Sequence, residues 1–220
     1  IIFRLPYYPD RILHHAIMNI LEPIWVSVFT KDTYSCIKGR GIHGAMRNVK
    51  RAIKDRENAR YCLKIDIRKF YPSIDHDVLK TIIRRKIKCK DTLALLDTII
   101  DSTDGVPIGN YLSQYFANLM LAYFDHWIKE EKRVRNYFRY ADDMVFLAST
   151  KEELHILLAD IKKYLAALKL TLKGNEQIFP IAENRADKHG RGLDFVGFVF
   201  YHNQTLMRKS IKQNFCRMAA

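Results

Sequence analysis

A pair of aspartates inside an aromatic, apolar run constrains this chain more than any other feature. Asp142 and Asp143 lie within the stretch Tyr137–Ser149, which reads YFRYADDMVFLAS. Aromatic and branched residues on both sides of a short polar break are typical of two strands joined by a tight turn. Two carboxylates held together there repel each other unless a cation is bound. A site for a hard divalent cation is one interpretation, and ordinary turn chemistry is the other.

The charge of the chain restricts its partners. Its 220 residues contain 37 Lys and Arg against 24 Asp and Glu, which gives a formal net charge of +13. Such a charge favours a polyanionic partner, nucleic acid first, and leaves a merely soluble basic protein as the alternative. The hydrophobic fraction of 48% supports a substantial core, and the length fits one large domain or two small ones.

The cysteines and the apolar runs indicate a compartment. The four cysteines show no C-x-x-C spacing, so we expect neither a zinc site nor a disulfide framework, and reduced thiols suit the cytoplasm. No apolar run approaches the length of a membrane span, and no signal peptide is recognisable. We therefore expect a cytoplasmic protein that has no membrane partner.

A third carboxylate, Asp66, lies on a predicted strand, Tyr61–Ile67. Alternation along this strand places two groups of side chains on opposite faces: Cys62, Lys64 and Asp66 on one, and Leu63, Ile65 and Ile67 on the other. A charge on a central strand is costly unless it is paired or binds a metal. Asp66 is therefore a second candidate for a cation site.

Periodicity and punctuation predict the remaining elements of one compact α+β unit. Helices are expected over residues 11–29, 43–55, 76–88, 92–101, 110–131 and 150–168, and strands over 170–173, 177–181, 193–201 and 205–208. Pro23 should bend or break the first helix. Ser73 or Asp75 can cap the third helix, and Thr150 begins a capping box. Lys38 and Arg40 lie on a glycine-flanked loop that either holds phosphates or is simply solvated.

Several blocks of this sequence resemble the motifs of reverse transcriptases, in the same order. They are Asp66, then Gly109 with Ser113-Gln114, then Tyr140-Ala-Asp-Asp143, and then Gly192-Leu-Asp-Phe-Val-Gly197. Pro9–Arg11 and Tyr34–Gly41 are similar to the first blocks of bacterial reverse transcriptases related to group II introns. The resemblance extends from about Pro9 to Lys209. The form Ile108-Gly-Asn-Tyr-Leu-Ser-Gln114 resembles the reverse transcriptases of diversity-generating retroelements.

The resemblance implies a right-hand polymerase of the α+β class. It would have fingers and a palm, with an antiparallel palm sheet backed by helices and with the thumb largely absent. The implied boundaries are fingers over residues 1–60 and 78–105, palm over 61–77 and 106–200, and a palm–thumb junction, or the start of a thumb, over 201–220.

The resemblance also implies an RNA-directed DNA polymerase that uses two metal ions, is error-prone and is part of a diversity-generating retroelement. Its catalytic residues would be Asp66, Asp142 and Asp143, which together with Ile67 would bind two Mg²⁺, with Mn²⁺ as a substitute. Its nucleotide-binding residues would be Lys38, Arg40, Tyr71, Ile108, Gly109, Ser113, Gln114 and Tyr140, with Tyr71 as the gate against a ribose 2′-hydroxyl. Phe195 and Gly197 would grip the primer.

The implied partners are an RNA template, a DNA or RNA primer, deoxynucleoside triphosphates and a small basic accessory protein. One departure concerns the lysine that usually follows the last palm helix, since Glu176 and Gln177 occupy that region. Lys173 is the substitute proton donor for pyrophosphate. Two alternatives remain: a defence-associated or other group II-like bacterial reverse transcriptase, and a nucleic-acid-binding protein with an inactive polymerase fold.

Overall fold

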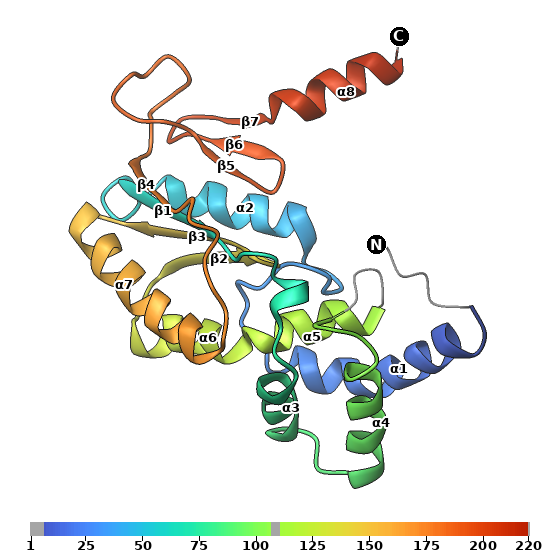
Figure 1. Ribbon diagram of the computed structural model, residues 1–220. Helices are drawn as coiled ribbons and strands as arrows, with labels where there is room; N and C mark the ends of the chain where they lie inside the picture. The colour runs from blue at the N-terminus through green and yellow to red at the C-terminus, as the bar shows by residue number, and fades with distance from the viewer. Residues whose placement is uncertain (1–6, 107–110, 220) are drawn as a thin grey trace.

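A computed structural model describes residues 7–106 and 111–219 of the chain. Among these residues the larger sheet is antiparallel, and its strand order is β2-β3-β1-β4. The strands are β1 (Tyr61–Asp66), β2 (Asn136–Tyr140), β3 (Asp143–Ala148) and β4 (Gln177–Pro180). The two inner strands, β1 and β3, therefore carry Asp66 and Asp143, each at a strand end (Figure 1).

The larger sheet separates two apolar cores. The alternation predicted for β1 is confirmed, because Leu63, Ile65 and Ile67 belong to one core and Cys62 to the other. The first core lies against α5 (Tyr111–Met120), α6 (Ala122–His126) and α7 (Lys151–Ala167). The second lies against α2 (Gly41–Ile53) and a smaller sheet of β5 (Leu193–Phe195), β6 (Phe198–Phe200) and β7 (Thr205–Met207) (Figure 1).

A group of helices extends the first core beyond the sheet. They are α1 (Ile12–Val26), α3 (His76–Arg84) and α4 (Lys90–Ile100), with the short helical turns η1 (Tyr7–Arg11), η2 (Tyr71–Ser73) and η3 (Trp127–Glu131). Helices α1 and α3 pack on α5, and Trp25 of α1 contacts the rings of Tyr115 and Phe116. Helix α8 (Lys209–Ala219) projects from the smaller sheet (Figure 1).

Two predicted helix caps are confirmed. The Asp75 carboxylate accepts a hydrogen bond from the backbone N–H of Val78 at 3.1 Å, so Asp75 rather than Ser73 begins α3. The Thr150 hydroxyl accepts one from the N–H of Glu153 at 3.3 Å and begins α7. Pro23 lies inside α1 and does not end it.

Three predicted elements are wrong in their extent. The helix over 110–131 is interrupted at Leu121, whose backbone leaves the helical region, so it divides into α5, α6 and η3. The strand over 193–201 is a hairpin, because Val196 and Gly197 take positive φ angles of 45° and 87° and reverse the chain. The strand over 170–173 is reduced to one bridge between Leu172 and Ile67, because β4 occupies the preceding part of that edge of β1.

Candidate active site

Strand register brings the three candidate carboxylates to one end of the larger sheet. Asp66 and Asp143 are direct partners in the antiparallel pair of β1 and β3. Side chains opposite each other in such a pair lie about 5 Å apart at Cβ. Asp142 belongs to the two-residue turn closed by the pair of Tyr140 and Asp143. The hairpin predicted from the sequence is therefore confirmed, and its turn lies beside the end of β1.

The carboxylates line a cleft of about 560 Å³. Its other lining residues come from β1, from β4 and the loop before it, and from β5 and the residues just before it: Lys64, Ile65, Asn175, Gln177, Phe179, Arg191, Gly192 and Asp194. A volume of this size lies within the range typical of sites for small ligands. The cleft mixes acidic and basic groups, which suits a ligand that carries both phosphates and cations.

Burial and the repulsion between neighbouring carboxylates raise the pKa values of Asp142 and Asp143. Burial, together with the carboxylates of Asp66 and Asp143, raises the pKa of Asp142 to about 6. Burial also raises the pKa of Asp143, against the opposing effect of the Lys64 ammonium group. Perturbation of this kind in a cleft marks a candidate functional site.

Two lysines partly neutralise the cluster. Lys64 Nζ lies 3.3 Å from a carboxylate oxygen of Asp143, and it donates a hydrogen bond to the carbonyl of Asp194 at 2.6 Å. Lys173 Nζ lies 3.0 Å from Asp66, and this hydrogen bond raises the pKa of the lysine. The backbone N–H of Lys173 also donates to the carbonyl of Asp66 at 2.9 Å. The contact of Lys64 could have been anticipated, because it shares a face of β1 with Asp66.

The donor set fits a hard divalent cation in an open site. Asp143 Oδ1 is buried and has no hydrogen-bond partner among the described residues. An orphaned carboxylate oxygen beside two further carboxylates supplies the ligand type that Mg²⁺ prefers. In residues 7–106 and 111–219, no three His, Cys, Asp or Glu side chains enclose a cation position. Mg²⁺ commonly takes some of its ligands from substrate phosphates and water.

Two predicted nucleotide-binding tyrosines lie beside the carboxylates. Tyr71 is half-buried in η2, and burial, together with the charges of Cys36 and Asp142, raises the pKa of its hydroxyl to about 12. The Tyr71 ring is therefore close to the charge of Asp142. Tyr140 ends β2, is half-buried and faces Asp143 in the strand register.

The structure does not bring the predicted cations of the glycine-flanked loop into the carboxylate cleft. Arg40 Nη1 donates hydrogen bonds to the backbone carbonyls of Thr30 and Thr33, and burial lowers the pKa of its guanidinium. Arg40 lines a separate pocket of about 190 Å³, and Lys38 is exposed. Arg40 thus shapes the loop that carries it.

The remaining predicted site residues differ in accessibility. Phe195 is fully buried in the second core, and Gly197 turns the hairpin of β5 and β6 close to Ile211 of α8. Ser113 is buried in α5 and Gln114 is half-buried. Ile108 and Gly109 lie outside the described residues.

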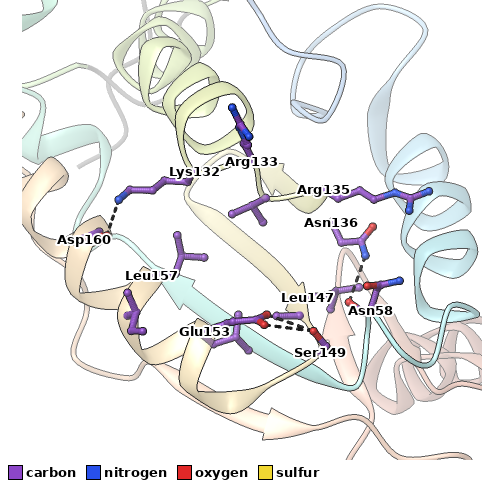
Figure 2. A pocket seen from close by; sticks show the side chains of 14 residues that line it. Asn58, Lys132, Arg133, Arg135, Asn136, Leu147, Ser149, Glu153, Leu157 and Asp160 are labelled. Atoms are coloured by element: carbon purple, nitrogen blue, oxygen red, sulfur yellow. Dashed lines mark hydrogen bonds and ion pairs between the residues drawn. The ribbon is translucent and has the colours of Figure 1, made fainter.

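A second cavity, of about 430 Å³, lies at the far end of β3. Figure 2 shows its wall, where Lys132 pairs with Asp160 at 2.6 Å and the Ser149 hydroxyl contacts Glu153. Its acidic groups are thus already engaged, and they come from α7 rather than from the central strands. The carboxylate cleft, rather than this cavity, is the candidate active site.

The fold and the carboxylate motif agree with a known family. Residues 3–175 match the family described as Reverse transcriptase (RNA-dependent DNA polymerase). The chain belongs to this family. None of the helices in the described part of the chain is long and apolar enough to cross a membrane.

Three bacterial proteins illustrate the similarity, and two of them are named as group II intron or retron proteins. Protein YkfC of Escherichia coli strain K12 is 24% identical over 252 residues, covering 94% of this chain and 63% of that protein. The group II intron-encoded protein LtrA of Lactococcus lactis subsp. cremoris is 27% identical over 139 residues, covering 58% and 23%. The Retron Ec73 reverse transcriptase of Escherichia coli is 26% identical over 206 residues, covering 81% and 60%. The chain spans less than two thirds of each relative.

Solved structures confirm the fold class. The telomerase of Candida tropicalis in complex with the TWJ fragment of telomeric RNA superposes with a TM-score of 0.68 at 13% identity, covering 97% of this chain and 42% of that chain. The apo telomerase truncated from the C-terminal domain gives 0.63 at 14% identity, covering 91% and 45%. The chain therefore has a right-hand reverse transcriptase fold, as the sequence predicted.

Proposed function

We propose that this protein is an RNA-directed DNA polymerase whose catalytic carboxylates are Asp66, Asp142 and Asp143. The observation that carries this proposal is their convergence from β1 and the β2–β3 turn, with an orphaned Asp143 oxygen, in a protein of the reverse transcriptase family. A protein that only binds nucleic acid has no need of three carboxylates, which repel a phosphate backbone.

The three aspartates, Ile67 and Lys173 each have a proposed role. The three aspartates hold Mg²⁺, or Mn²⁺ in its place, and Ile67 adds only its carbonyl oxygen because its side chain is buried in the core. Bound Mg²⁺ lowers the pKa of a primer 3′-hydroxyl and offsets charge on the phosphates. Lys173 holds a proton at Nζ beside Asp66, which suits it to protonate the leaving pyrophosphate.

Other residues position the nucleotide and the primer. Tyr71 would exclude the ribose 2′-hydroxyl, with Tyr140 as its neighbour across Asp142. Gly109, Ser113 and Gln114 would form the nucleotide side of the cleft. Lys38, which is exposed, is the loop cation proposed to contact a triphosphate, while Arg40 keeps the loop in shape. Because Phe195 is buried, the primer grip would act through the backbone of the hairpin that contains Gly197.

The domain boundaries suggested by the sequence are retained as part of this proposal. We propose palm for residues 61–77 and 106–200, which contain the larger sheet with α5, α6 and α7. Residues 1–60 and 78–105 would form the fingers, and 201–220 the palm–thumb junction, which includes α8. The substrates would be an RNA template, a DNA or RNA primer and deoxynucleoside triphosphates. A small basic accessory protein would be a further partner.

The finer proposal is an error-prone enzyme of a diversity-generating retroelement. It rests on the sequence Ile108–Gln114, where Ile108 replaces the glutamine expected in related enzymes. Isoleucine can neither donate nor accept a hydrogen bond, and one such bond is worth about 0.5–1.5 kcal/mol. The full-length Ile108→Gln protein should therefore misincorporate about 2- to 13-fold less, most visibly opposite template adenine. Equal error spectra at matched extension rates would make Ile108 a packing residue.

Primer extension tests the activity itself. The full-length protein should add deoxynucleotides to a primer annealed to RNA when Mg²⁺ is present, and EDTA should stop the reaction. A defence-associated or other group II-like enzyme would extend the same primer without preferential errors at adenine. A protein that binds the RNA–primer duplex with wild-type fold and adds no nucleotide would be the inactive alternative.

A further inference from the structure

A fully buried ion pair lies directly behind the catalytic turn. Arg139 Nη2 and Asp125 Oδ2 are 2.6 Å apart, and both side chains have 0% exposure. Of the ion pairs among the described residues, only this one has both partners fully buried. A buried pair is a weak source of stability, because apolar residues of similar volume often stabilise a core equally well. Its presence points to a role in geometry.

The polar groups around this pair are hydrogen-bonded to residues of several elements. The Asp125 carboxylate, from α6, accepts hydrogen bonds from the Tyr137 hydroxyl at 2.6 Å and the Thr33 hydroxyl at 2.9 Å, as well as from Arg139. The guanidinium of Arg139, from β2, also donates to the side-chain oxygen of Asn118 at 3.2 Å. A network that is satisfied in this way specifies one arrangement of its elements.

One contact of the network reaches the catalytic turn itself. Arg139 Nη1 donates to the backbone carbonyl of Ala141 at 3.0 Å. Ala141 precedes Asp142 and has a φ of 54°, in the left-handed region that favours glycine. An alanine stays in this conformation only when its surroundings hold it there. The Arg139 guanidinium is the group in the structure that holds the carbonyl.

Other contacts bind the same network to the segment Asp32–Ser35. The backbone N–H of Arg139 donates to the carbonyl of Asp32 at 2.9 Å, and its carbonyl accepts from the N–H of Tyr34 at 3.0 Å. The Asn118 amide donates to the carbonyl of Ser35 at 2.9 Å. The segment Asp32–Ser35 is thus fixed to the strand that leads into Asp142.

We propose that Arg139 and Asp125 form a clamp that holds Ala141 in its left-handed conformation and so positions the Asp142 carboxylate relative to the segment Asp32–Ser35. The inference rests on the proposed function for its significance, since Asp142 is a proposed metal ligand. Arg139 is a positioning residue, because it is fully buried behind the turn and touches no substrate. Displacing a reacting group by about 1 Å is enough to reduce a rate by about a hundredfold.

Binding of Mn²⁺ to the chain, measured by electron paramagnetic resonance, reads out the position of the carboxylates without any reaction. Arg139→Lys keeps the positive charge and shortens the reach to Ala141. We expect its Mn²⁺ affinity to fall about tenfold and amide exchange to accelerate in residues 139–143 and 32–36. Leu165→Ala, which truncates a buried side chain of α7, is the control for an equal loss of thermal stability. It should change neither the Mn²⁺ affinity nor the amide exchange of these residues.

A second substitution separates positioning from packing. Glycine adopts the left-handed region without cost, so Ala141→Gly in the Arg139→Lys background should restore most of the lost Mn²⁺ affinity. A residue that acted only through core packing would not be rescued in this way. If Arg139→Lys does not fold, Thr33→Val removes one hydrogen bond to Asp125, keeps the ion pair, and should lower the affinity two- to threefold.

Two results would overturn the clamp. Arg139→Lys could bind Mn²⁺ with the same affinity as Leu165→Ala, or Ala141→Gly could fail to restore the Mn²⁺ affinity of Arg139→Lys. Failure of the proposed function would look different. Wild-type protein that neither binds Mn²⁺ nor extends a primer would remove the assignment of the carboxylates. In that case, exchange at residues 139–143 would still decide whether Arg139 holds the turn.

Discussion

Asp142 is held in a conformation that suits chemistry better than it suits stability. Its pKa rises from 3.8 to about 6 on folding, chiefly through burial, so the folded protein binds the proton more tightly than the unfolded chain does. The contribution of this group to the free energy of unfolding therefore decreases as the pH rises from about 4 to about 6. Above that window the charged form is a constant penalty of up to ~3 kcal/mol, reduced by solvent screening.

Asp142→Asn should therefore stabilise the metal-free protein while it abolishes extension. We expect the variant to be more stable than wild type by about 1–2 kcal/mol at pH 7, and the difference to shrink as the pH approaches 4. Denaturant unfolding in EDTA at several pH values measures this. A variant that is less stable than wild type at pH 7 would show that the Asp142 carboxylate is not under stress.

Tyr71 is the second residue whose role can be isolated. The charge of Asp142 acts on its hydroxyl, and we propose that its ring meets the sugar of an incoming nucleotide. Tyr71→Val should raise ribonucleotide incorporation relative to deoxynucleotide by about tenfold or more, because a smaller side chain leaves room for a 2′-hydroxyl. Competition between the two sugars on one primer measures this ratio. Tyr164→Phe, in α7 and outside the cleft, is the control, and an unchanged ratio in Tyr71→Val would locate the gate elsewhere.

Individual residues differ in how much the sequence revealed about them. The three aspartates could be found because carboxylates in an apolar run are chemically unusual. Lys173 was noticed through a departure from the family pattern, and the structure adds its contact with Asp66. Arg139 gave no signal, because a charged residue in a strand is ordinary until its burial is known. The Arg40 guanidinium, expected to face a phosphate, bonds to its own loop.

At the scale of elements, one glycine locks η2 against the turn that follows α4. Gly105 has a φ of 64°, and a Cβ there would come within 2.6 Å of the Pro72 carbonyl and 2.7 Å of the Tyr71 carbonyl. The N–H of Val106 also donates to the Tyr71 carbonyl at 2.9 Å. The position of the Tyr71 ring thus depends on a close approach that only glycine allows.

Gly105→Ala should destabilise the protein by about 1–3 kcal/mol and displace Tyr71. Gly174→Ala is the matched control, because Gly174 has a φ of 82° and no atom within 4 Å of a built Cβ. The control measures the conformational cost alone, so the excess loss at Gly105 measures the clash. Equal losses in the two variants, read from thermal unfolding, would mean that Tyr71 is held by other contacts.

Elements were predictable where one local signal determines them. The caps at Asp75 and Thr150 and the β2–β3 hairpin depend on neighbouring residues only, and all three are confirmed. The interruption at Leu121 could not be foreseen, because the apolar stripe continues through it while the backbone changes direction. The hairpin at Val196-Gly197 was missed because its flanks form one continuous apolar run.

At the scale of the whole molecule, RNA affinity and catalysis should depend on different residues. The net charge of +13 is distributed over many lysines and arginines, and each phosphate contact on a single strand adds about −0.7 to the slope of log affinity against log salt. Asp142→Asn should therefore retain the RNA affinity and the salt slope of wild type. Filter binding at several salt concentrations measures both, and a large loss of affinity in the variant would mean that the carboxylates contribute to RNA binding.

The pairing of strands in the sheet brings the separate sequence motifs together into one site. The motifs alone could not state the strand order β2-β3-β1-β4, which makes Asp66 and Asp143 neighbours across 77 positions of chain. Family resemblance implied an antiparallel palm sheet without its strand order, and strand pairing supplies that order. The contacts of α6, β2 and the segment Asp32–Ser35 through Asp125 became visible only in three dimensions.

Single-turnover extension of a primer on an RNA template, titrated with Mg²⁺, tests the central claim most directly. Wild-type full-length protein should extend with a rate that depends on Mg²⁺, and Asp66→Asn and Asp142→Asn should each lower the maximal rate by at least about a thousandfold. Asp160→Asn, which alters a carboxylate of the second cavity, should extend like wild type. Extension by Asp66→Asn or Asp142→Asn at a rate near that of wild type would contradict the assignment of the catalytic carboxylates.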